Sequence, residues 1–120
     1  MVLNTGNQEA TEAFLKIKKG ASDVTVTVIV TSNPPSDPGH SVQKAWKLTV
    51  ASGSLNGARV TASGTDSPSF YIGCDPTIPV PDTSGWDDLA TTPTNPVVPG
   101  MRTAVLPNPA CNPSYLVLVT

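Results

Sequence analysis

The chain has 120 residues, 38% hydrophobic and 13% charged, with a formal net charge of −2 at pH 7. This length fits one domain, and so low a net charge argues against intrinsic disorder. Seven basic residues without a cluster exclude a phosphate-tracking surface, so we expect no nucleic-acid partner. No apolar run approaches the roughly 18 residues of a membrane span, so we predict none. The N-terminus lacks the basic and apolar regions of a signal peptide.

The N-terminal segment is ambiguous between helix and strand. We interpret residues 1–13 as an arm that precedes a domain over residues 14–120. Four apolar residues have the helical spacing i, i+3, i+4, i+7: Ala10, Ala13, Phe14 and Ile17. This spacing favours a short helix over residues 8–13. Residues 14–18 alternate tolerably and are predicted to be extended.

The clearest strand pattern begins after Asp23, where valine alternates with threonine or isoleucine as far as Thr31. Four valines share one face and are predicted to point into the core: Val24, Val26, Val28 and Val30. A second alternation runs over residues 42–51 and places Trp46, Leu48 and Val50 inward. The following Asn56-Gly57 pair is a candidate type I′ turn.

Further short strands are predicted at residues 58–62, 69–73, 101–106 and 115–120. About seven strands separated by Gly, Pro, Asn and Ser turns are typical of an antiparallel β-sandwich, either immunoglobulin-like or jelly-roll-like. Trp46 resembles the core tryptophan of immunoglobulin-like domains. The resemblance goes no further, because the paired core cysteines are missing.

Residues 74–100 differ from the rest. They hold six prolines, which are excluded from central strands, and they show little periodicity. So long an excursion from a compact domain is often a contact surface. Trp86 lies within it. The residue has three interpretations, of which the first is favoured: covering its own core, contacting another subunit, or stacking on a sugar.

The two cysteines, Cys74 and Cys111, both lie in proline-rich loops. A disulfide between them would close a loop of roughly 37 residues and stabilise the fold by about 3–4 kcal/mol. Two free thiols in a reducing cell are the alternative. The chain has no Cys-x-x-Cys pair, so we predict no zinc site.

We predict no enzyme and no cofactor. His40 lies beside Ser41 and near Asp37, but residues so close in one loop cannot form a catalytic triad. Four aspartates cluster in the proline-rich excursion: Asp75, Asp82, Asp87 and Asp88. Their spacing is too irregular for a calcium loop, so we predict no metal site.

Because we recognise no catalytic or metal-binding residues, the sequence favours a structural role through protein–protein contacts. The first hypothesis is a self-assembling or decorating protein, such as a small virion coat, cement or tail component. The last strand is apolar and could add to a neighbour's sheet. Candidate interface residues are Trp86, Tyr115, Leu116 and Leu118. The alternative is an extracellular β-sandwich module for adhesion or carbohydrate binding, or a pilin-like subunit. Both place the protein on a virion or an extracellular surface.

Overall fold

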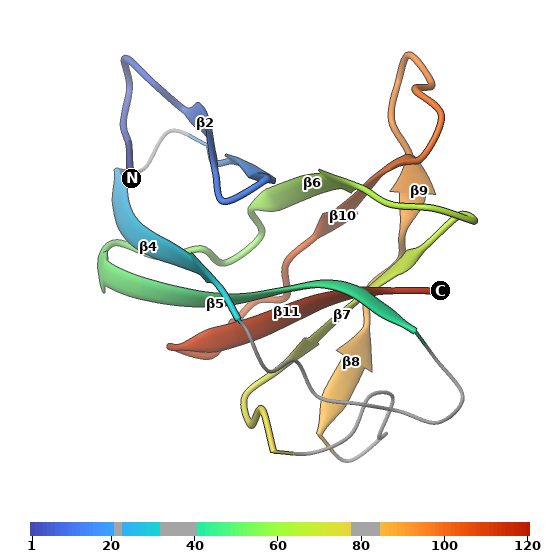
Figure 1. Ribbon diagram of the computed structural model, residues 1–120. Helices are drawn as coiled ribbons and strands as arrows, with labels where there is room; N and C mark the ends of the chain where they lie inside the picture. Colours follow the sequence, from blue (N-terminus) through green and yellow to red (C-terminus); the bar gives the residue numbers. More distant parts are fainter. Residues whose placement is uncertain (21–22, 32–40, 78–84) are drawn as a thin grey trace.

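The computed structural model describes residues 1–20, 23–31, 41–77 and 85–120. All of the regular secondary structure in these ranges is β-strand. The strands form two antiparallel sheets that pack face to face (Figure 1), which confirms the predicted β-sandwich. The described residues contain no helix that is long and apolar enough to cross a membrane.

The larger sheet has six strands in the order β1-β4-β5-β11-β7-β8. Its strands are β1 (Val2–Leu3), β4 (Val24–Val30), β5 (Val42–Ser52), β7 (Ser69–Gly73), β8 (Trp86–Asp88) and β11 (Ser114–Val119). The smaller sheet has five strands in the order β2-β3-β6-β10-β9. They are β2 (Glu9–Glu12), β3 (Leu15–Lys18), β6 (Arg59–Ser63), β9 (Thr92–Pro93) and β10 (Met101–Val105).

The core lies between the two sheets and follows the alternation of the sequence. Successive side chains of a strand point to opposite faces, so every second residue enters the core. Trp46 and Leu48 of β5 are buried as predicted, whereas Val50 is only half-buried. The Trp46 ring lies beside Phe70, with 6.4 Å between ring centroids. The Trp46 indole Nε1 donates a hydrogen bond to the Ala13 carbonyl at 2.7 Å.

Strand β4 departs from the prediction at its end. Val24, Val26 and Val28 are buried, but Val30 is 50% exposed. Val30 has the inward parity but lies at the rim of the sandwich, beyond the packed core. Alternation therefore gave the correct face of the strand but not the depth of its last residue.

The predicted helix over residues 8–13 is wrong. Residues 9–12 form β2, which makes a hairpin with β3 through Ala13 and Phe14. Both turn residues have positive φ, 55° and 66°. That conformation suits the right-handed twist of a hairpin but normally calls for Asn or Gly. The apolar spacing matched a helix because the turn residues themselves are apolar.

The predicted N-terminal arm is also wrong, because residues 1–13 contribute β1 to one sheet and β2 to the other. Strand β1 pairs with β4, and Leu3 is fully buried. The Met1 ammonium donates hydrogen bonds to the Val26 carbonyl at 2.6 Å and to Glu12 Oε2 at 3.2 Å. The first residues thus join the edge of one sheet to the edge of the other.

The Asn56-Gly57 turn is not the predicted hairpin turn. It lies between β5 and β6, which belong to different sheets. Gly57 has a φ of 71°, while Asn56 is not among the residues with positive φ. A type I′ turn needs positive φ at both central residues. The Asn56 Oδ1 instead accepts a hydrogen bond from the Ala110 backbone at 2.9 Å and so holds a distant loop.

The proline-rich excursion contains two short strands that the sequence pattern did not predict. Strands β8 and β9 each lie at an edge, one on each sheet. Pro93 occurs within β9, where an edge position tolerates the missing backbone donor. Residues 78–84 of this excursion lie outside the described residues.

An asparagine side chain continues the pairing between β5 and β11 beyond the first residue of β11. Asn112 Oδ1 accepts a hydrogen bond from the Val50 backbone N–H, and its Nδ2 donates to the Val50 carbonyl, both at 2.9 Å. The primary amide thus makes the two bonds that a paired backbone residue would make. The next residue, Pro113, has no N–H to offer β5.

Candidate functional site

The structure joins Cys74 and Cys111 in a disulfide, with 5.7 Å between their Cα atoms. Cys74 directly follows β7, and Cys111 precedes β11. Because β7 and β11 are neighbours in the larger sheet, with Gly73 opposite Tyr115, the disulfide fastens the ends of two adjacent strands. Of the two alternatives left by the sequence, the structure therefore has the bonded pair.

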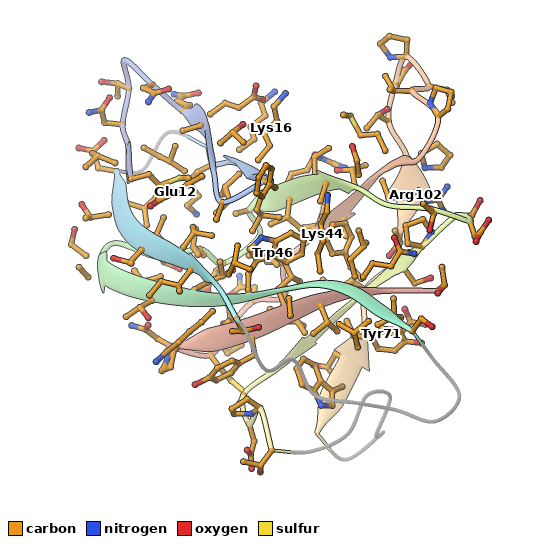
Figure 2. The ribbon with its side chains drawn as sticks, in the orientation of Figure 1. Glu12, Lys16, Lys44, Trp46, Tyr71 and Arg102 are labelled. Carbon is orange, nitrogen blue, oxygen red and sulfur yellow. A yellow bond between two sulfur atoms is a disulfide. The ribbon has the colours of Figure 1, made fainter. Side chains whose placement is uncertain are left out.

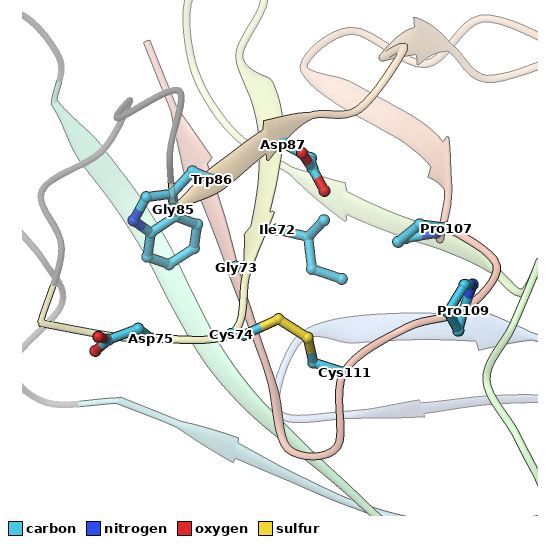
Figure 3. Close-up of a pocket in the computed structure, with 10 residues that line it drawn as sticks. All are labelled: Ile72, Gly73, Cys74, Asp75, Gly85, Trp86, Asp87, Pro107, Pro109 and Cys111. Atoms are coloured by element: carbon cyan, nitrogen blue, oxygen red, sulfur yellow. A yellow bond between two sulfur atoms is a disulfide. The ribbon is translucent and has the colours of Figure 1, made fainter.

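A hollow of about 260 Å³ opens beside this disulfide (Figure 3). Ile72, Trp86 and two prolines supply its apolar wall, and the carboxylates of Asp75 and Asp87 are the charged groups that line it. The site therefore gathers both cysteines and the tryptophan that the sequence singled out. The described residues that line it include no nucleophile and base pair of the kind that acyl or phosphoryl transfer requires.

Trp86 is a buried structural residue. Its side chain is only 4% exposed and packs with Ala45, Val117 and Val119 in a second apolar cluster. The ring lies against Gly73 (Figure 3): a Cβ on Gly73 would lie 2.8 Å from the indole carbon Cδ2. This packing agrees with the favoured interpretation, in which Trp86 covers its own core, and it leaves the ring little surface for another subunit or a sugar.

Of the other candidate interface residues, two are unavailable and the third is only partly exposed. Leu116 and Leu118 are fully buried between the sheets, and Tyr115 is half-buried against the second apolar cluster. The prediction failed because β11 is a central strand, paired with β5 on one side and β7 on the other. It has no free edge to offer a neighbour.

The acidic residues of this region make no metal site among the described residues. Asp75 is exposed, and its carboxylate accepts hydrogen bonds from the Thr77 hydroxyl at 2.6 Å and the Thr77 backbone at 2.9 Å. These bonds, the hydroxyl first, hold the pKa of Asp75 below its ordinary value of 3.8. The predicted non-catalytic His40, with Asp37 and Asp82, lies outside the described residues.

Sequence reasoning missed Phe14. The β2–β3 turn carries it at the rim of the sandwich, where its side chain is 76% exposed. Lys44 places its Nζ 5.9 Å from the Phe14 ring centroid. Trp46 and Lys44 both project from β5 toward the smaller sheet (Figure 2). The hydrogen bond from Trp46 to Ala13 supports the turn in its costly left-handed conformation. The sequence signal that could have indicated this turn is the apolar pair Ala13-Phe14 between two segments of alternating residues.

Val30 lies close to this turn. A shallow hollow of about 170 Å³ is lined by Phe14, Val30, Val42 and Trp46, among others. Ile29, on the opposite face of β4, is 51% exposed. The Thr31 hydroxyl, which belongs to a residue lining this hollow, is buried and has no hydrogen-bond partner among the described residues. Apolar groups that a monomer normally covers are therefore collected at one margin of the sandwich.

No family model, no curated protein and no solved structure matches this chain.

Proposed function

We propose that the protein is a structural component that acts through protein–protein contacts. It is a self-assembling or decorating protein, of the kind found as a small virion coat, cement or tail component. The observation that carries this proposal is the exposed apolar margin formed by Phe14, Ile29 and Val30. Exposed apolar groups gathered at a sheet edge are typical of surfaces that other chains cover.

The character of the hollows supports the same proposal. The hollow beside the disulfide contains a buried indole, prolines and two carboxylates, a set that lacks a general acid–base pair held at reacting distance. Catalysis and cofactor binding rely on convergent polar groups. The hollow at the Phe14 turn is instead lined mainly by apolar groups, which suit contacts with another protein.

A second candidate is an extracellular adhesion or pilin-like module, favoured by the Cys74–Cys111 disulfide. Disulfides persist mainly in secreted proteins, in the periplasm and on virion or cell surfaces. The disulfide therefore supports a virion or extracellular location under either proposal. Carbohydrate binding has less support, because Trp86 is buried.

Sedimentation of the purified chain over a range of micromolar concentrations tests the first proposal. We expect a mass that rises with concentration, and a Phe14→Ser variant that associates less. A glycan array probed with the same wild-type chain tests the carbohydrate alternative. A strictly monomeric chain that binds glycans would overturn the assembly proposal in favour of the second.

A further inference from the structure

We propose that the open edge of β4 pairs with the same edge of a second copy of this chain, so that two six-stranded sheets become one. The inference rests on the proposed assembly function and names its contact. Figure 1 shows β4 near one margin of its sheet, beside the N-terminus. Only the first residues of that edge are covered, because β1 pairs with Val24 and Thr25, and Met1 binds the backbone of Val26.

The other edges of the sandwich carry features that discourage strand addition. Strand β2 has a glutamate at each end, β9 contains a proline, and β8 ends in two aspartates. Charges, prolines and short length are the usual protection of an edge strand. From Thr27 to Val30, strand β4 has neither a charge nor a proline. This segment therefore carries none of these protections, and β1, an uncharged edge strand too, is only two residues long.

Backbone hydrogen bonds show which residues face outward. Val26 donates to the Met1 carbonyl at 3.0 Å and accepts from the Met1 ammonium at 2.6 Å, so its backbone faces away from β5. Thr31 donates to Ala45 of β5 at 3.0 Å. Because these directions alternate along a strand, Val28 and Val30 also face outward. No described residue pairs with their N–H and C=O groups.

Val28 and Val30, whose backbone groups face outward, are separated by one residue, and this spacing makes the edge self-complementary. In an antiparallel pair centred on Ile29, Val28 meets Val30 of the second copy and Val30 meets Val28 of the second copy. Each meeting is a hydrogen-bonded pair, which gives about four bonds in all. A register centred on Val28 would need Val26 of each copy, whose backbone is already bound to Met1. The register centred on Ile29 uses the free groups and no others.

The side chains fit the same register. The two Ile29 side chains would meet in a non-hydrogen-bonded pair, with Cβ atoms about 4.5–5.5 Å apart. This pairing would cover Ile29 and Val30, which are half exposed in the single chain. Lys47 of β5 lies opposite Ile29, so two Lys47 residues would be about three strand spacings apart, or roughly 14 Å. Salt screens charges at that separation.

Such a contact is isologous, because each copy contributes the same surface. It closes on itself as a dimer and does not extend into a fibre. Three residues on each side make a small interface, so we expect weak association that depends on concentration. A twofold contact of this kind is a suitable building unit for a larger coat.

Disulfide trapping tests the register. In an Ile29→Cys variant, the two new thiols would lie face to face, and mild oxidation should convert most chains into a covalent dimer. Thr27→Cys is the matched control, on the same strand and the same exposed face. In the proposed register the two residues at position 27 are separated by about 14 Å along the strands, so this variant should stay monomeric. Mass spectrometry of peptides from the dimer would identify the link between the two substituted positions.

Sedimentation provides the second measurement, without any new cysteine. Val30→Lys should weaken dimerisation at least tenfold, because it places two charges beside the contact. Val97→Lys is the control, since Val97 is 71% exposed on the β9–β10 connection and should leave the mass unchanged. Circular dichroism of each variant verifies that the fold is retained.

The outcomes separate the contact from the function. Trapping at position 29 together with a monomeric Val30→Lys chain supports the proposal. Oligomers that persist in Val30→Lys and leave Ile29→Cys untrapped would overturn this contact while leaving an assembly function in place. A chain that is monomeric at every concentration, without trapping, overturns both.

Discussion

The two margins of the six-stranded sheet differ in the contacts that the chain makes there. On the β8 side, a disulfide fastens the ends of β7 and β11, and Trp86 of β8 covers Gly73. At the β4 margin, two residues of β1 cover part of the edge, while Ile29 and Val30 remain exposed. We call the β8 side the closed margin, because contacts within the chain fasten it, and the β4 side the open margin, because part of its edge is left available.

This difference separates stability from interaction. Contacts at the closed margin link residues far apart in the sequence, so their loss should weaken the fold. The open margin buries little and includes a turn in a left-handed conformation that costs stability. Substitutions should therefore destabilise the protein at the first margin and be neutral or stabilising at the second.

The largest expected effect is at Trp86. Trp86→Ala should lower the free energy of unfolding by about 3–5 kcal/mol, because it leaves a cavity over the sheet face. Urea denaturation monitored by circular dichroism measures this change. Val97→Ala, at an exposed position, serves as the control and should change stability by no more than about 0.5 kcal/mol. A loss below about 1 kcal/mol at Trp86 would show that the ring is not packed as described.

The next effect is that of the disulfide. Replacing Cys74 and Cys111 together by alanine should cost about 3–4 kcal/mol, because the open chain regains the entropy of a long loop. Wild-type protein compared with and without reductant gives an independent value. Hydrogen exchange should rise first near the ends of β7 and β11. Equal urea midpoints for the oxidised and reduced protein would contradict the prediction.

At the open margin the expected sign reverses. A double variant, Ala13→Asn with Phe14→Gly, should stabilise the protein by about 1–2 kcal/mol, since both new residues accept positive φ more readily. Phe14→Ser is the control that removes the ring without relieving the backbone. Thermal unfolding distinguishes the two. If the double variant is no more stable than Phe14→Ser, the turn is not under the strain described.

The smallest effect is that of Asp75. Thr77 lowers the pKa of this carboxyl in the folded chain, so the charged form stabilises the fold above the ordinary pKa. That contribution is lost as the pH falls through the lower, folded-state pKa. In Thr77→Val the pKa of Asp75 should rise toward its ordinary value, as measured by NMR titration. An unchanged pKa would show that the threonine hydroxyl does not hold the carboxylate.

Much of the fold was predictable because burial imposes a period of two. Thr27 and Ile29 alternate with buried valines, and Trp46 and Leu48 of β5 enter the core as the pattern predicts. Short strands and turns in sequence order were sufficient to predict a sandwich. Alternation contains no information on strand order, however. Tyr115 and its neighbours were therefore expected to be free to pair with another chain, whereas they lie in a central strand.

The remaining wrong predictions share one cause. Each relied on a local sequence pattern, and contacts with residues distant in the sequence overrode that pattern. Ala13 and Phe14 adopt a turn that Asn and Gly prefer, and a hydrogen bond from Trp46, 33 residues away, supports it. Trp86 is buried because β8 pairs with β7, which a proline-rich composition conceals. Composition alone also left the Cys74–Cys111 pairing undecided. The open edge of β4 became visible only once its neighbours were known.

Asn112 gives the protein a chemically durable connection. Asparagine side chains are lost with age mainly when the backbone nitrogen of the next residue attacks the amide and expels ammonia. The next residue here is Pro113, whose nitrogen carries no hydrogen and cannot complete that ring closure. The Asn112 side-chain amide, which is hydrogen-bonded to the Val50 backbone, is thus protected from this deamidation reaction. Asn56, which is followed by Gly57, lacks that protection, so ageing of this protein should begin at the turn between the sheets.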